Sequence, residues 1–98
     1  MLDFSKIKFE DEFINGANEL YDIYFIAPKD ILPKEYPDAE FATIWLEVSP
    51  WDTSYKNAVA RVSPTKFSEK YNGYLDYDWT DIFLSEEELN ALLKIRED

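Results

Sequence analysis

The sequence predicts an α+β fold: a small antiparallel sheet of four or five strands packed against a C-terminal helix and one short helix. Three observations support this fold class. The chain has 98 residues, which suits one domain. Its hydrophobic fraction is 46%, with 17% aromatic residues, and this is enough to build a core. Apolar and polar residues alternate over much of its length, and helical spacing returns near the C-terminus. We therefore treat residues 1–98 as a single acidic globular domain.

Residues 7–26 are typical of a β-hairpin, because two alternating runs flank Asn15-Gly16. A strict two-residue loop would place charged residues opposite apolar ones. We therefore expect a bulge, or a loop of three or five residues, that keeps apolar residues opposite one another. That register pairs Ile7 with Ile23 and Phe9 with Tyr21.

Three prolines then break the alternation, so residues 28–40 are predicted to form a long ordered loop with one short helical turn near 30–32. Residues 41–48 give the clearest strand, and bulky side chains on both of its faces indicate a central position. Residues 57–62 predict a shorter strand.

The C-terminal third contains two predicted helices. Ser63-Pro64 favours the start of a short helix over 64–72, with Gly73 as its stop. Residues 74–84 are predicted to be extended. Ser85 then caps the final helix, and Glu88 completes a capping box.

The chain contains no histidine and no cysteine. This excludes a Ser-His-Asp triad, a thiol nucleophile and the usual zinc sites. An Asp-rich run from Asp76 has the spacing of a calcium loop, but Asp81 stands where that loop needs glycine. We therefore predict a protein that is not an enzyme, with no catalytic residues, no cofactor and no structural metal.

The formal net charge is −11. Phosphates would be repelled by such a surface, so we expect no direct contact with nucleic acid or an anionic membrane. A basic protein is the partner that this charge favours. Acidity that serves only solubility is the alternative. The first residues carry no signal-peptide pattern, and we expect a cytoplasmic protein. The sequence does not indicate an oligomeric state.

Two stretches concentrate the negative charge. Residues 10–22 contain five acidic residues and no basic one, and residues 76–88 contain six and again no basic one. Aromatic residues interleave with the second stretch, and such a mixture suits arginine and lysine side chains of a partner. An ordinary solvent face and a favourable helix dipole are the alternative explanations. The predicted partner-binding residues are Asp76, Asp78, Trp79, Asp81, Glu86 and Glu87, with Trp51 and Tyr55 from a polar loop.

These features favour an acidic protein that inhibits or neutralises a basic protein, such as a nuclease or another nucleic-acid-binding protein. An immunity protein and a phage-type nucleic-acid mimic are the two forms of this hypothesis. A mimic would spread its carboxylates along a line, whereas an immunity protein would gather them around an aromatic anchor. The competing classes are a small carboxylate-dependent enzyme and a structural or assembly subunit.

Overall fold

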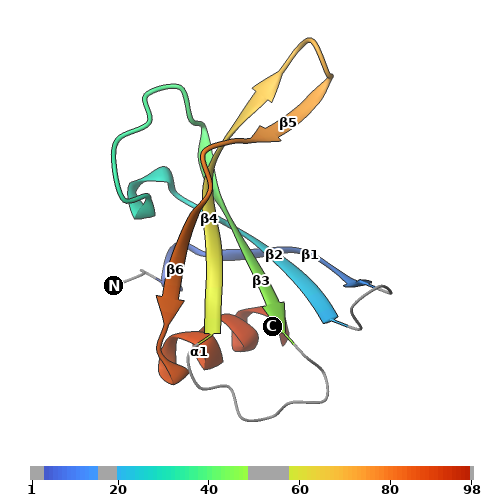
Figure 1. Cartoon of the computed structure of the whole chain (residues 1–98), viewed down its shortest axis with the longest axis vertical. Coiled ribbons are helices and arrows are strands. Elements are labelled where there is room, and N and C mark those ends of the chain that lie inside the picture. The colour runs from blue at the N-terminus through green and yellow to red at the C-terminus, as the bar shows by residue number, and fades with distance from the viewer. Residues whose placement is uncertain (1–3, 16–19, 49–57, 98) are drawn as a thin grey trace.

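A computed structural model describes residues 4–15, 20–48 and 58–97 of the chain. It is an α+β fold, as predicted: an antiparallel sheet with a C-terminal helix and two short 3-10 turns (Figure 1). The strands run in the order β1-β2-β3-β4, and both β5 and β6 pair with the remaining edge of β4. The elements are η1 (Phe4–Lys6), β1 (Lys8–Asn15), β2 (Leu20–Ala27), η2 (Lys29–Ile31), β3 (Phe41–Val48), β4 (Ala58–Ser68), β5 (Gly73–Asp76), β6 (Thr80–Leu84) and α1 (Glu86–Glu97).

The predicted hairpin is β1 with β2, but its predicted register is wrong by four positions. Phe9 lies opposite Phe25, not opposite Tyr21. A bulge follows Phe9, since Asp11 lies opposite Tyr24 and Glu10 is left as the extra residue of β1. Apolar residues face each other at this pair, where the rings of Phe9 and Phe25 meet edge to face at 6.2 Å, but elsewhere the rule fails, since Glu12 lies opposite Ile23 and Phe13 opposite Asp22. Asn15 pairs with Leu20, so the connection is centred later in the sequence than the predicted turn at Asn15-Gly16, and this sets the different register.

The strand over residues 41–48 is confirmed as β3, and it lies in the middle of the sheet between β2 and β4. The loop before it carries η2, close to the helical turn predicted over 30–32. Residues 42, 44 and 46 are fully buried, whereas Glu47 is exposed on the other side. The alternation therefore assigned the two faces of this strand correctly.

The predicted short helix over 64–72 is wrong. β4 continues through Pro64 to Ser68 and then turns back into β5, so these residues form a β-hairpin that extends away from α1 (Figure 1). Pro64 pairs with Ala42 of β3, and its carbonyl accepts from the Tyr77 amide on the opposite edge. Proline is tolerated here because its missing N–H falls on that edge, where pairing is interrupted. Asn72, not Gly73, takes the positive φ of the turn.

The extended segment over 74–84 divides into β5 and β6. Thr65 pairs with Asp76 and Val62 pairs with Thr80, so two residues of β4 face three residues, 77–79, of the other strand. This difference of one residue is a bulge, and Asp78 occupies its left-handed position with φ of 53°. The division gives six strands, where four or five were expected.

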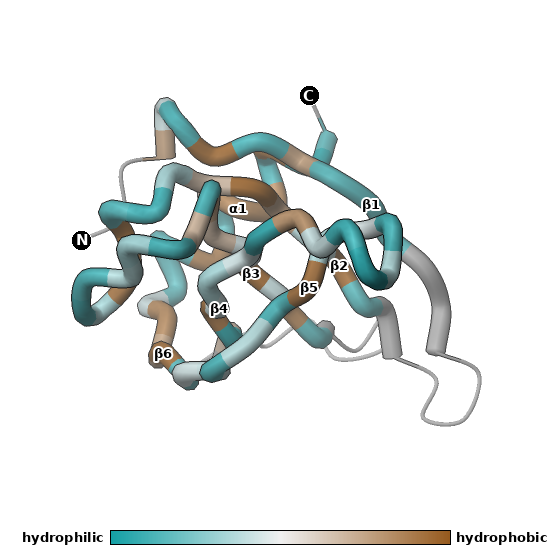
Figure 2. Tube along the Cα trace, turned by 90° about the horizontal axis from the view of Figure 1, so that it is seen from above, coloured by the Kyte–Doolittle hydropathy of each residue, from teal (hydrophilic) through white to brown (hydrophobic). Residues whose placement is uncertain are grey.

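The core lies between α1 and one face of the sheet, which we call the inner face. Figure 2 shows hydrophobic residues gathered where α1 meets the central strands. Helix and strand residues share this cluster: Ile23, Phe25, Ala42, Ile44, Leu46, Ala60, Val62, Leu84, Leu89 and Leu92. Among the described residues, no helix is long and apolar enough to cross a membrane.

The capping box of α1 is confirmed. The Glu88 amide donates to Ser85 Oγ at 3.1 Å, and the Ser85 amide donates to Glu88 Oε1 at 3.1 Å. The two bonds satisfy amides that a helix start leaves unpaired. They position α1 so that Leu89 and Leu92 reach the core.

We expect Ser85→Ala to lower the free energy of unfolding by about 1 kcal/mol, because it removes the acceptor for the Glu88 amide. Urea unfolding followed by circular dichroism measures the change. Ser85→Asp is the control, since an aspartate retains the acceptor and should restore most of the stability. Equal losses in both variants would contradict the assignment of the cap.

Candidate functional site

The face of the sheet opposite α1, which we call the outer face, carries a row of polar and aromatic residues. Cross-strand pairing aligns the row from β1 through β2, β3 and β4 to β6. Tyr24 stacks on Trp45, with ring centres 6.0 Å apart and planes at 7°. The Arg61 guanidinium lies 4.8 Å from the Trp45 ring centre. The row consists of Asp11, Tyr24, Trp45, Arg61 and Asp81.

Next to this row, the outer face is hollowed into a groove of about 300 Å³. Carboxylates from the two acidic stretches of the sequence meet in it: Glu10 and Asp11 come from β1, and Asp76 comes from β5. None of the described lining residues is basic. Aromatic rings, hydroxyl groups and one aliphatic side chain form the rest of the lining: Tyr24, Ile26, Phe41, Thr43, Thr65 and Tyr74.

Two bulges place the three carboxylates. Strict alternation would send Glu10 and Asp11 to opposite faces of β1, but the bulge at Glu10 leaves both in the lining of the groove. The bulge at 77–79 ends β5 at Asp76, opposite Thr65. Thr65 Oγ1 donates to Asp76 Oδ1 at 2.7 Å and lies 2.8 Å from Thr43 Oγ1, so buried hydroxyls orient this carboxylate.

The carboxylates give the groove a negative potential. Burial raises the pKa of the Tyr24 phenol, and the charges of Asp22, Asp76 and Glu47 raise this pKa further. Among the described residues, no salt bridge involves Glu10, Asp11 or Asp76. The groove therefore holds negative charge that the described part of the fold does not neutralise.

Asp78 and Asp81, in contrast, have cationic partners that are distant in the sequence. Asp78 accepts from the Tyr36 hydroxyl and lies 3.4 Å from Lys34 Nζ. Asp81 lies 3.5 Å from Arg61 Nε. The sequence segment that carries them has no basic residue, but tertiary structure supplies two. Asp81 thus tethers β6 and Asp78 tethers the bulge before it. Because both are paired with cations, they add less unneutralised negative charge to the surface than the sequence suggested.

Trp79 lies on the outer face and is 45% exposed. Its ring centre lies 5.7 Å from that of Trp45 with the planes at 65°, so Trp79 packs on the outer face and not under the C-terminal helix. Phe83 follows on the same face of β6 and is 78% exposed. The rings of Tyr24, Trp45 and Trp79 thus connect the groove to an exposed apolar edge.

The remaining predicted residues lie elsewhere. Glu86 and Glu87 are exposed in the first turn of α1, which covers the inner face, so the structure does not bring them to the groove. Trp51 and Tyr55 fall outside the described residues. Only Asp76 of the predicted set lines the groove, while Trp79 and Asp81 lie on the same face of the sheet.

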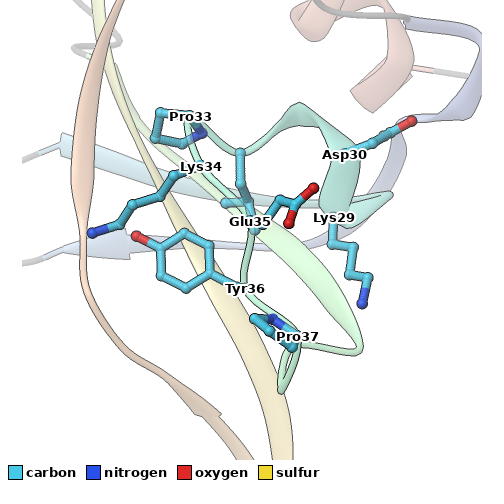
Figure 3. Close-up of a pocket in the computed structure, with 8 residues that line it drawn as sticks. Lys29, Asp30, Pro33, Lys34, Glu35, Tyr36 and Pro37 are labelled. Atoms are coloured by element: carbon cyan, nitrogen blue, oxygen red, sulfur yellow. The ribbon is translucent and has the colours of Figure 1, made fainter.

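A second concavity, of about 610 Å³, lies within the loop over residues 29–37 (Figure 3). Its lining mixes Lys29 and Lys34 with Asp30 and Glu35, so it has no dominant charge. Figure 3 shows Lys34 and Tyr36 side by side at one side of the loop. Tyr36 and Lys34 hold Asp78, and this gives the loop a structural role.

Sequence reasoning missed most of the groove. Glu10 and Asp11 belong to a run of three acidic residues inside an alternating strand, and such a run breaks the period of two. This break in the alternation is the sequence feature that could have predicted a bulge at this position. No comparable signal marks Tyr24, Phe41 or Tyr74, since aromatic residues at alternating positions are also typical of a core.

Comparisons with protein-family models, curated proteins and solved structures found no significant match to this chain. A functional assignment therefore depends on the physical properties of the outer face.

The Asp78 contacts predict a pH dependence. The Tyr36 hydroxyl and then the Lys34 ammonium hold the pKa of Asp78 below its usual range. A carboxylate with a lowered folded-state pKa adds stability above its unfolded pKa of about 3.9, and this stability disappears as the pH falls through the folded value. We expect wild type to exceed Asp78→Asn in unfolding free energy by a constant amount above about pH 5, with the difference shrinking below about pH 4.

Urea unfolding between pH 3 and neutrality measures this difference. The control repeats the comparison in a Tyr36→Phe background, which lacks the hydroxyl that donates to Asp78. There the pH-dependent part should shrink. A difference that grows as the pH falls would contradict the contact.

Proposed function

We propose that this protein binds a basic protein through the outer face of its sheet and thereby blocks that protein's activity. The observation that carries the proposal is the groove, where Glu10, Asp11 and Asp76 converge from the two acidic stretches without a basic side chain in the described lining. Negative charge confined to a concave surface raises the association rate of a positively charged partner. The formal charge of −11 adds a long-range attraction of the same sign.

The arrangement favours an inhibitor of the immunity-protein type over a nucleic-acid mimic. A mimic requires carboxylates spread along a line, in place of phosphates. Here the carboxylates gather in one groove beside Tyr24, Phe41 and Tyr74, and Trp79 is exposed on the same face. Tyrosine and tryptophan are enriched in protein–protein interfaces, and the carboxylates beside them suit arginine, which interfaces also enrich.

A structural or assembly role is a second candidate, and one observation favours it. The hairpin of β4 and β5 carries four exposed large hydrophobic residues, Phe67, Tyr71, Tyr74 and Leu75. Exposed apolar side chains on a projecting hairpin suit contact with another subunit. In that case, substitutions at the hairpin tip, such as Tyr71→Ser, would remove binding while substitutions in the groove would not.

The groove is tested with two charge-matched variants. Asp11→Asn with Asp76→Asn, and Glu87→Gln with Glu97→Gln on α1, each change the formal charge by the same amount, −11 + 2 = −9. Tagged wild-type protein and both variants are used to capture proteins from a lysate, and the captured proteins are identified by mass spectrometry. The affinity of each variant for the identified partner is then measured by calorimetry. We expect a basic partner whose Kd rises at least about tenfold for the groove variant only.

Two outcomes would contradict this proposal. Equal weakening by both variants would indicate that net charge alone attracts the partner. An unchanged affinity in the groove variant would place the interface elsewhere. If only the helix variant binds weakly, the interface includes the predicted residue Glu87 on α1. Rising salt should weaken binding, because charges beyond about 8 Å are screened at physiological ionic strength.

Trp79 tests the apolar part of the same face. We expect Trp79→Ala to weaken binding of the captured partner at least about tenfold, as loss of an interface anchor does. The loss of unfolding free energy should stay below about 2 kcal/mol, because the side chain is 45% exposed.

Phe25→Ala is the stability control for Trp79→Ala. Phe25 is fully buried, so this variant should lose about 3–5 kcal/mol. If Trp79→Ala proves as destabilising as Phe25→Ala, Trp79 acts in folding and another residue must anchor the partner.

A further inference from the structure

The groove on the outer face has a chemistry more specific than negative charge. Its described lining combines three carboxylates with the rings of Tyr24, Phe41 and Tyr74 and the hydroxyls of two threonines. Phe41 and Tyr74 lie 5.2 Å apart with planes tilted by 59°, so they present ring surfaces in different directions. Carboxylates alone would accept any cation, whereas ring surfaces next to them favour a flat, weakly hydrated one.

The sheet already contains one example of this combination. Arg61 lies with its guanidinium carbon 4.8 Å from the Trp45 ring centre and its Nε 3.5 Å from Asp81 Oδ1. Trp45 in turn stacks on Tyr24, which lines the groove. The outer face thus holds a guanidinium between a ring and a carboxylate immediately beside the groove. The groove offers rings and carboxylates of the same kind, with no such cation from the described residues.

Asp76 is prepared to accept a donor. Thr65 Oγ1 donates a hydrogen bond to Asp76 Oδ1 at 2.7 Å, and this bond orients the carboxylate. Three buried polar atoms on the same face have no hydrogen-bond partner in the described structure, Asp22 Oδ1, Trp45 Nε1 and Ser63 Oγ, but their residues do not line the groove. An oriented carboxylate pairs well with the fixed fork of N–H donors that a guanidinium presents.

Building on the proposed function, we infer that the groove binds an arginine side chain of the partner, with the guanidinium paired to Asp76 and Asp11 and stacked against Tyr74 or Tyr24. Lysine fits less well, because its ammonium is a compact and strongly hydrated charge that gains less from the rings and cannot form a planar two-bond pair. The partner is therefore a basic protein that presents an arginine on a loop or an extended segment. The groove selects among basic proteins by this residue.

The test uses defined peptides and isotope-labelled protein. A short acetylated and amidated peptide of glycine and serine with one central arginine is titrated while amide resonances are followed by NMR. The same peptide with lysine, or with uncharged citrulline, is titrated in parallel. We expect the arginine peptide to shift the amides around Asp11, Tyr24 and Asp76 and to bind at least about fivefold more tightly than the lysine peptide. Citrulline should give no saturable shift.

Variants assign the contacts. Asp11→Asn with Asp76→Asn should lower the affinity for the arginine peptide at least about fivefold, whereas Glu87→Gln with Glu97→Gln should leave it unchanged. Tyr74→Ser should bring the arginine-to-lysine affinity ratio toward one if the ring provides the selectivity.

Three results would overturn this inference: equal binding of the lysine peptide, binding of citrulline, or shifts confined to residues outside the groove. They would leave the proposed function standing if capture of the whole partner still depends on Asp11 and Asp76. If the capture experiment finds no partner that depends on Asp11 and Asp76, but the peptides still show selective arginine binding, the proposed function is wrong and the arginine site is retained.

Discussion

Pro64 lacks an amide hydrogen, and it stands in a strand that is paired along both edges. β4 keeps its pairing with β3 through Pro64, but it cannot donate to the strand on its other edge at this point. The opposite segment therefore bulges over residues 77–79, where Asp78 adopts a left-handed conformation. Tyr36 and Lys34 hold Asp78 in that position. Because β5 ends before this bulge and β6 begins after it, the bulge determines which face of the sheet Asp76 and Asp81 reach.

The second bulge, at Glu10, lies in the edge strand β1, which supplies the other two carboxylates of the groove. Alternation in a regular strand would separate two consecutive carboxylates, and the extra residue in β1 removes that separation. Glu10, Asp11 and Asp76 line this groove without a described cation among them. Other carboxylates in this protein have a cationic partner within the chain, since Asp81 pairs with Arg61 and Glu12 pairs with Arg96. A cation of a partner would supply the pairing that the described part of the fold does not provide in the groove.

The sequence was sufficient for the elements whose signals are local. The hairpin, β3 and the capped helix α1 depend on alternation, turn residues and a capping box that lie within a few positions of one another. The helix predicted over 64–72 was wrong because Ser63-Pro64 is also compatible with a strand whose pairing is interrupted at the proline. The register of the hairpin and the site were not predictable in the same way. They depend on two bulges and on contacts such as Lys34 with Asp78, between residues far apart in the chain.

Eight of the described acidic residues in the two acidic stretches divide into three groups with different physical roles. Glu86, Glu87 and Glu88 begin α1, where carboxylates interact favourably with the helix dipole, and Glu88 also completes the cap. Asp78 and Asp81 pair with cations of the chain and hold β6 in place. These two groups are explained by folding alone. The carboxylates of the groove belong to neither group, since the described residues supply no cation for them. Charge density along the sequence does not separate the three groups, because all of them occur within residues 76–88 or 10–22. The separation depends on the positions of the described cations, and it identifies the groove as a part of the acidic surface that pairing with a described cation does not explain.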